Sequence, residues 1–238
     1  MLVLTALPGL AEPNRTLAAA MLAELAPLIA ARPAADHPVV SVVVAPGEQI
    51  GSARALLPHG EGWIVELGLD TGWVGRTLTA TEILPRWGLC LRSRTVLATD
   101  LVGDFVEHVC ACEPRARPRF DDALLVVTEL LANAVLHGNL QDLPPDRAAE
   151  AWLDRGVALA AGLTGRALSF TVSQETGFYP SSARLEDADP AEFQALLGES
   201  SGRGLMIVAS LCISVIIGAD RRSCRAIFDV PPAVSVSD

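Results

Sequence analysis

Short apolar runs alternate with longer helical segments over the first 85 residues of the chain. The runs MLVLTAL, VVSVVVA and GWIVELGL have the length and the β-branched content of buried strands. Between them lie two segments with helical patterns, NRTLAAAMLAELAPLIAA and IGSARALL. Strands that alternate with helices usually pair in parallel, so residues 1–85 are predicted to form a small α/β domain.

This small domain has the element order of a receiver domain without the receiver's chemistry. A receiver needs an acidic cluster after its first strand and a phosphoacceptor aspartate at the end of its third. Here the first strand runs into TALPG, and Asp70 alone lies near the third. We therefore interpret residues 1–85 as a receiver-like scaffold or partner-docking domain.

The segment TEILPRWG ends the alternating pattern, and a second domain is predicted over residues 86–238. Its predicted helices are TVLATDLVGDFVEHVCA, FDDALLVVTELLANAVLH, PDRAAEAWLDRGVALAAG and GRGLMIVASLC. Its predicted strands are LCLRS, RALSFTVSQ, ISVIIGA and CRAIFDV. Helices laid on an antiparallel or mixed sheet give a sandwich, so the predicted fold class is α+β.

Charge and composition exclude several classes of function. The 18 basic residues are all arginine, against 28 acidic residues and a formal net charge of −10. This balance argues against a general nucleic-acid or anionic-membrane surface, and the absence of lysine excludes a Walker-type phosphate loop or a Schiff base. No apolar run reaches bilayer length and the amino end lacks the basic start of a signal peptide, which predicts a cytoplasmic protein. The five cysteines are predicted to be free thiols.

The stretch TELLANAVLHGN places three polar residues in an otherwise apolar helix. Asn133 falls one turn after Glu129, and His137 lies a further turn along. Because the flanking positions are apolar, this polar stripe is predicted to line a partly buried groove. Burying a carboxylate is costly unless it is paired or holds an ion, which favours a binding site. The alternative is a solvated stripe on a surface helix.

A second motif, ESSGRGLMIV, places Gly202 and Gly204 at the start of a strongly apolar helix. Free backbone amides at a helix start form a ready anion site. A tight entry from loop to helix would also explain the glycines.

Together these motifs resemble those of a known ATP-binding fold. ELLANAVLHGN resembles the N box, and ESSGRGLMIV the second glycine box, of the histidine kinase-like (GHKL) ATPases, which include DNA gyrase, heat-shock chaperones, MutL and sensor histidine kinases. The stretch from GFYPSSARLEDADP to GRGLMIVASLC is most similar to the anti-sigma-factor serine kinases of bacterial partner-switching systems. The resemblance covers residues 89–232.

The resemblance implies a site for ATP and Mg²⁺. Asn133 would contribute an oxygen ligand to the metal, and Glu129 would orient or deprotonate the attacking hydroxyl or water. Backbone amides from Gly202 to Gly204 would hold phosphates, with Arg203 as a charged contact. The segment 177–201 would form a lid, and His137 would lie on the groove wall.

The first glycine box departs from the family pattern of Asp-x-Gly-x-Gly. In VSQETGFYP, alignment on Gly177 places Ser173 where the adenine-binding aspartate belongs and Glu175 where the first glycine belongs. A shift by one residue offers Gln174 instead. Neither register supplies the carboxylate, which predicts weak adenine binding.

The leading interpretation is a bacterial signalling regulator of transcription. It would bind a sigma factor or an anti-sigma antagonist and phosphorylate a serine if active, and a homodimer is left open. The alternative is a nucleotide-independent binding module on the same fold. A split histidine kinase is disfavoured, because the sequence lacks the H-E/D-x-x-x-P phosphoacceptor helix.

Overall fold

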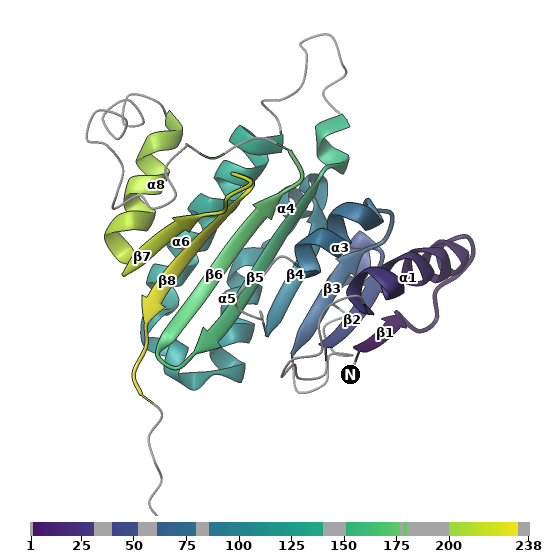
Figure 1. Ribbon diagram of the computed structural model, residues 1–238, viewed down its shortest axis with the longest axis horizontal. Coiled ribbons are helices and arrows are strands. Elements are labelled where there is room, and N and C mark those ends of the chain that lie inside the picture. The colour runs from purple at the N-terminus through teal and green to yellow at the C-terminus, as the bar shows by residue number, and fades with distance from the viewer. Residues whose placement is uncertain are drawn as a thin grey trace, which may run out of the picture.

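One mixed sheet organises the protein. The computed structural model describes residues 2–30, 40–51, 61–79, 86–139, 151–176, 179 and 200–232. Within them an eight-stranded sheet has the order β1-β2-β3-β4-β5-β6-β8-β7 (Figure 1). The strands are β1 (Leu2–Ala6), β2 (Val40–Ala45), β3 (Gly62–Glu66), β4 (Trp87–Arg92), β5 (Gly156–Thr164), β6 (Ala167–Gln174), β7 (Ser214–Ile217) and β8 (Ser223–Asp229). Pairing is parallel from β1 to β4 and antiparallel from β4 onward, and the predicted α+β class is confirmed.

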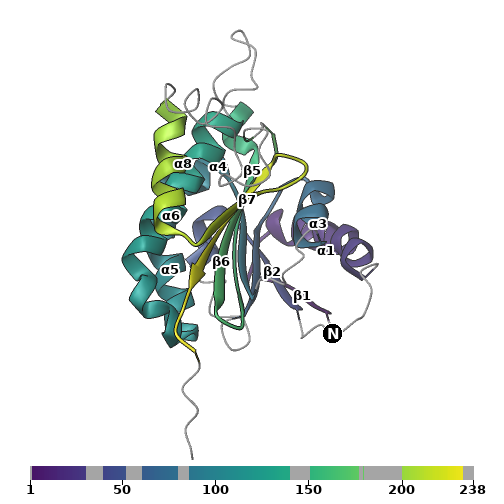
Figure 2. The same cartoon turned by 60° about the vertical axis from the view of Figure 1, so that its left-hand side comes forward.

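Helices cover the two faces of the sheet unequally (Figure 2). The α-helices are α1 (Asn14–Ala30), α3 (Thr71–Thr79), α4 (Ser93–Ala98), α5 (Leu101–Cys112), α6 (Phe120–Ala132) and α8 (Ser200–Leu211). Short 3₁₀ turns occupy η1 (Gly47–Gln49), η3 (Pro114–Arg119) and η5 (Ala151–Asp154), and a π-helix continues α6 over Asn133–Asn139. Helices α1 and α3 lie on one face beside the amino-terminal strands, and α5, α6 and α8 lie on the other.

The sheet runs without interruption across the predicted boundary near residue 85. β3 pairs with β4 in parallel, with Gly62 opposite Trp87 and Val65 opposite Cys90. β4 then pairs with β5 along its whole length. The two predicted domains therefore share one hydrogen-bonded sheet.

The prediction of a helix over PDRAAEAWLDRGVALAAG is wrong for its second half. Residues 156–164 form β5, which lies between β4 and β6 and is buried at its first seven positions. A strand buried on both faces loses the alternation that marks a strand, and its alanines fit a helix equally well. Pairing with two neighbouring strands decides the outcome, while residues 145–150 lie outside the described part of the chain.

Other elements differ from prediction at their ends. The helix expected over residues 95–111 is two helices, α4 and α5, separated at Thr99 and Asp100. Helix α3 was not predicted, and most of IGSARALL lies outside the described residues. No helix of the described chain is long and apolar enough to cross a membrane.

The core lies on both faces of the sheet, against α1 and α3 on one side and against α5, α6 and α8 on the other. Phe170 of β6 contacts Phe105 of α5 and Phe228 of β8 through edge-to-face ring pairs with centroids 6.4 and 6.0 Å apart. Both geometries are favourable for aromatic side chains. Phe170 thereby identifies the side of β6 that faces these helices.

Candidate functional site between α6 and α8

The polar stripe of α6 lies at the edge of the core. Val126, Val127 and Leu130 of the same helix are fully buried, while Glu129 is half-buried and Asn133 is 8% exposed. The Glu129 carboxylate makes no hydrogen bond or ion pair within the described residues. The Asn133 Nδ2 atom is also buried without a hydrogen-bond partner there. Two polar groups one turn apart are thus left to be satisfied by a ligand or by solvent.

Helix α8 meets this stripe at Gly204. A methyl group at Gly204 would lie 2.5 Å from Oε2 of Glu129 and 3.5 Å from Nδ2 of Asn133. Glycine is therefore what lets the α8 backbone approach the two polar groups. The structure thus brings together the two sequence motifs, although Asn133 and Gly204 are 71 positions apart in the chain.

The first turn of α8 contains Gly202 and Arg203 and has no acidic residue. Its leading N–H groups have no intrahelical acceptors, and the helix dipole adds a partial positive charge there. The predicted anion-binding backbone therefore lies on the helix whose Gly204 touches Glu129.

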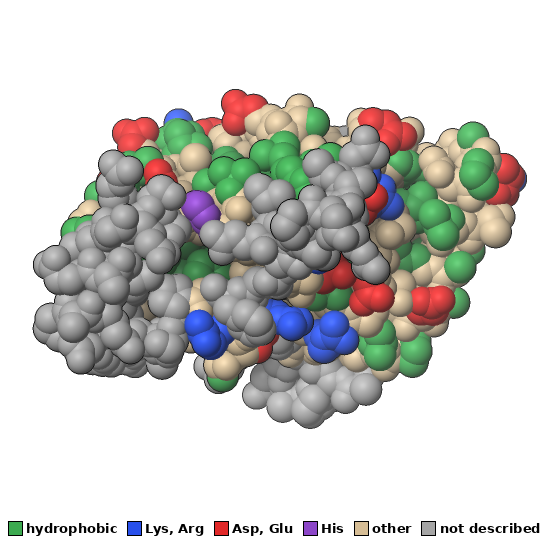
Figure 3. Space-filling view, turned by 90° about the horizontal axis from the view of Figure 1, so that it is seen from above, with side chains coloured by type: hydrophobic (Ala, Val, Ile, Leu, Met, Phe, Trp, Pro, Cys, Tyr) green, Lys and Arg blue, Asp and Glu red, His purple; other side chains and the backbone are tan. Residues whose placement is uncertain are grey.

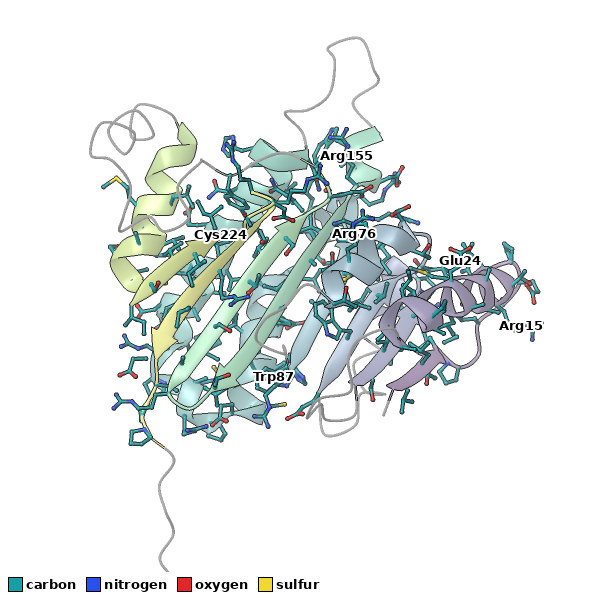
Figure 4. The ribbon with its side chains drawn as sticks, viewed as in Figure 1. Arg15, Glu24, Arg76, Trp87, Arg155 and Cys224 are labelled. Carbon is teal, nitrogen blue, oxygen red and sulfur yellow. The ribbon has the colours of Figure 1, made fainter. Side chains whose placement is uncertain are left out.

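The π-helix anchors the carboxyl end of α6 to the sheet. Asn139 is fully buried, and its Nδ2 donates to Oγ of Ser93 at 3.0 Å and to the carbonyl of Gly156 at 3.1 Å. Its Oδ1 accepts from the backbone N–H and the hydroxyl of Thr176 at 3.3 and 3.1 Å. Arg155 donates to the Asn139 carbonyl at 2.6 Å and to the Thr176 hydroxyl at 2.8 Å (Figure 4). Such π-helical segments are frequent at functional sites.

Sequence reasoning missed this Asn139 network. The signal was present, because Asn139 ends the same motif that contains Asn133, and polar residues in an apolar helix need partners. Its partners Ser93, Arg155 and Thr176 lie on separate elements, which the sequence did not bring together.

Ser173 and Gln174 point to opposite faces of the sheet. Successive side chains of a strand alternate, so Gln174 shares the side of Phe170 and faces the helices, while Ser173 faces away. Gln174 is 2% exposed, and its Oε1 has no partner within the described chain. A methyl group at Gly138 would clash with its carboxamide. The shifted register, with Gln174, is therefore the one that faces the α6 side of the sheet, where it lies against Gly138 of the π-helix.

Glu175 forms two hydrogen bonds with the backbone of Gly156, at the start of β5. Its Oε2 accepts a hydrogen bond from the Gly156 N–H at 2.6 Å, and its own N–H donates to the Gly156 carbonyl at 3.0 Å. These bonds hold the carboxylate at the start of β5.

The predicted lid falls almost entirely outside the described residues, and so does Gly177. Tyr179 is described: its backbone N–H donates to the Arg221 carbonyl at 2.6 Å, and Nε of Arg221 donates to the Tyr179 carbonyl at 2.8 Å. The Tyr179 hydroxyl is buried, and burial raises its pKa well above the ordinary value. This part of the segment is held against the turn before β8.

A metal at the site would have few protein ligands. Within the described residues no three His, Cys, Asp or Glu side chains form a metal-binding group. Mg²⁺ commonly takes one or two protein oxygens and completes its shell with phosphates and waters. The carboxamide of Asn133 fits that pattern when its oxygen is turned toward the metal, and so does the carboxylate of Glu129.

Comparison of the sequence with models of known protein families and with characterised proteins gives no match. The motifs and their geometry are therefore what bears on function.

Proposed function

We propose that the chain is a bacterial signalling regulator with an ATP-binding site of the histidine kinase-like class between α6 and α8. One observation carries the proposal: Gly204 of the glycine motif lies against Glu129 and Asn133, two polar side chains left without partners in the described residues. A structural glycine alone would not require these groups to be polar.

Each residue has a role in this proposal. The amide O and N of Asn133 are nearly interchangeable by rotation, so the side chain can offer its oxygen to Mg²⁺. The Glu129 carboxylate accepts the proton of a serine hydroxyl or water. Amides of the first turn of α8 hold phosphate oxygens, with Arg203 nearby in sequence. Bound Mg-ATP would supply the transferable phosphate and the charge that neutralises it.

Gln174 takes the place of the adenine-binding carboxylate. Its buried Oε1 is an unused acceptor on the helix-facing side of β6, suited to an amino group of a base. A neutral amide makes a weaker hydrogen bond than a carboxylate, so weak ATP binding is expected.

A nucleotide-independent protein-binding module is the second candidate. Large apolar side chains are exposed on the outer sides of α6 and α8, with Leu125 at 43%, Met206 at 36% and Ile207 at 37%. Exposed apolar surface of this kind suits a protein partner such as a sigma factor or its antagonist. This role needs no nucleotide and is compatible with the missing carboxylate.

Two variants of α6 test the nucleotide site. Asn133→Ala should abolish the Mg²⁺ dependence of ATP binding measured by calorimetry, because it removes the proposed metal ligand. Glu129→Gln should retain binding and lower turnover. Thr128→Ala, an exposed change beside Glu129, is the matched control and should alter neither. Unchanged Mg²⁺ dependence in Asn133→Ala would refute the assignment and leave the protein-binding module.

A further inference from the structure

A cavity of about 350 Å³ lies on the opposite side of the sheet from Glu129 and Asn133. Its walls come from β3, from α3, from the faces of β5, β6 and β8 that point away from α6, and from the turn before β8. Gln174, the last residue of β6, also borders it. Ser173, which the sequence alignment put at the adenine position, lines this cavity. Helix α3 closes one side, and α6 and α8 take no part (Figure 2).

Two tryptophans form a fixed wall of the cavity. A methyl group at Gly88 of β4 would strike the six-membered ring of Trp63, and one at Gly156 of β5 would strike that of Trp73. Each indole therefore lies directly on a glycine backbone. Both tryptophans are buried, at 3% and 4% exposure, so the wall is rigid and apolar.

Two arginines that line the same cavity have no carboxylate partner among the described residues. Among the described residues, at least eight arginines pair with a carboxylate, for example Arg86 with Glu61 at 3.0 Å. Arg76 and Arg225, which line the cavity, have no such pair there. Nε of Arg225 donates only to the Thr171 hydroxyl, at 3.3 Å.

The charge balance at the cavity is the reverse of that of the whole chain. Arg76, Arg222 and Arg225 line it against one acidic residue, Asp220, whose Oδ1 accepts from the Arg222 backbone N–H at 3.0 Å. Nearby Asp70 caps α3 through the Trp73 N–H at 2.6 Å. Figure 3, which looks onto one end of the sheet, shows basic side chains gathered along one side of the molecule. In a chain of net charge −10, such a cluster beside a hollow is a site for a negative group.

We propose that this cavity binds a small organic anion with an apolar or aromatic body and one carboxylate or phosphate group. The guanidinium groups of Arg76 and Arg225 recognise the anionic group, since the planar fork of arginine matches both oxyanions. The hydroxyls of Thr171 and Ser173 supply further donors. The apolar body rests against the tryptophans and Ala160. The cavity lies on the other face of the sheet from Glu129 and Asn133 and needs no Mg²⁺, and Gln174 at the end of β6 lies at its border.

Titration of the full chain with simple probes tests the proposal, with tryptophan fluorescence as the readout. Benzoate and phenyl phosphate carry the two candidate oxyanions on the same ring, and benzyl alcohol is the neutral control. Saturable binding of at least one anion without Mg²⁺, and none of benzyl alcohol, is expected. The anion that binds more tightly identifies the oxyanion.

Paired variants separate this cavity from other basic surfaces. Arg76→Gln with Arg225→Gln should weaken anion binding at least about tenfold, because two charged hydrogen-bond donors are lost. Arg76→Gln alone changes an exposed side chain and guards against misfolding of the pair; it should still weaken binding severalfold. Arg117→Gln with Arg166→Gln, which removes two exposed paired arginines elsewhere, should have no effect, and neither should Asn133→Ala.

Three results would overturn the proposal. The first is that benzyl alcohol binds as tightly as the anions. The second is that neither anion saturates the protein up to about 10 mM, the range of very weak binding. The third is that both Arg76 variants bind the anion as tightly as the unmodified chain. Failure of the nucleotide site leaves these measurements unaffected, because they use no nucleotide and no metal.

Discussion

The centre of the sheet and its β7 edge are buried in different ways. Each residue of β3 is buried, as are the first five of β4 and the first seven of β5. In β7 and β8 burial alternates along the strand. Within the described residues, helices cover both faces of the central strands, whereas β6, β8 and β7 are covered on one face, by α5, α6 and α8 (Figure 2).

This difference in burial separates the strands that form the core from the strands that line the candidate sites. Strands covered on both faces serve as core, and the strands near the β7 edge offer two distinct surfaces. On β6, Gln174 faces the helices and lies against Gly138 of the π-helix, and the open side contains Ser173 in the arginine-lined cavity, which Gln174 borders. One strand therefore contributes to both candidate sites through neighbouring residues.

The largest expected effect compares the two faces of β6 directly. Phe170→Ala should lower the free energy of unfolding by about 3–5 kcal/mol, because it empties a fully buried ring site. Thr171→Ala, one residue away on the open face, should cost less than about 1 kcal/mol, since it loses one long hydrogen bond to Arg225. Urea denaturation measures both. Similar losses would mean that the open face is packed in solution.

Glycine substitutions compare the centre of the sheet with the α6 site. Gly88→Ala should cost about 1–3 kcal/mol, because the rigid Trp63 ring cannot move aside. Gly204→Ala should cost less than about 1 kcal/mol, since the end of the Glu129 side chain can rotate away, but ATP turnover should fall. Gly103→Ala on α5, where a methyl group meets nothing closer than 3.6 Å, is the control. Thermal unfolding that ranks Gly204→Ala as the more damaging change would contradict this account.

Alkaline pH probes the helix-facing side of β8. Burial raises the pKa of Cys224 to about 12, from an ordinary value near 9.0 (Figure 4). The thiol stays neutral in the folded protein and ionises in the unfolded one, so stability is lost as pH rises above about 9, by about 1.4 kcal/mol per unit. Cys224→Ala should therefore flatten the decline of unfolding free energy between pH 9 and 10, whereas Cys112→Ala, at an exposed site, should leave it unchanged. Equal slopes in the wild type and Cys224→Ala would refute the buried thiol.

The smallest expected effect again contrasts neighbouring residues of β6. Gln174→Glu should strengthen ATP binding about fivefold and increase its preference over GTP, because a charged acceptor replaces a neutral one. Ser173→Asp should leave ATP affinity unchanged, since its side chain lies on the other face. Competitive binding of the two nucleotides measures this contrast. A gain with Ser173→Asp and none with Gln174→Glu would reverse the assigned register.

The sequence predicted the elements whose patterns are local. The strands β1 to β3, helices α1 and α8, and the Glu129–Asn133 stripe follow from periodicity and composition alone. β5 was mistaken for a helix because burial on both faces removes its alternation. Which face of the sheet Gln174 points to changes with a shift of one residue in the strand. The cavity combines Arg76 of α3 with Arg225 of β8, two residues far apart in the sequence. Such relations come from strand pairing, which local patterns do not encode.

Calorimetric titration of the unmodified full chain with ATP, with and without Mg²⁺, tests the central claim most directly. The account predicts saturable, Mg²⁺-dependent binding of ATP at one site per chain. The affinity should be weak, and GTP should bind about as tightly as ATP. No heat of binding from folded protein with ATP and Mg²⁺ in the millimolar range, where Kd corresponds to about 4 kcal/mol, would contradict it.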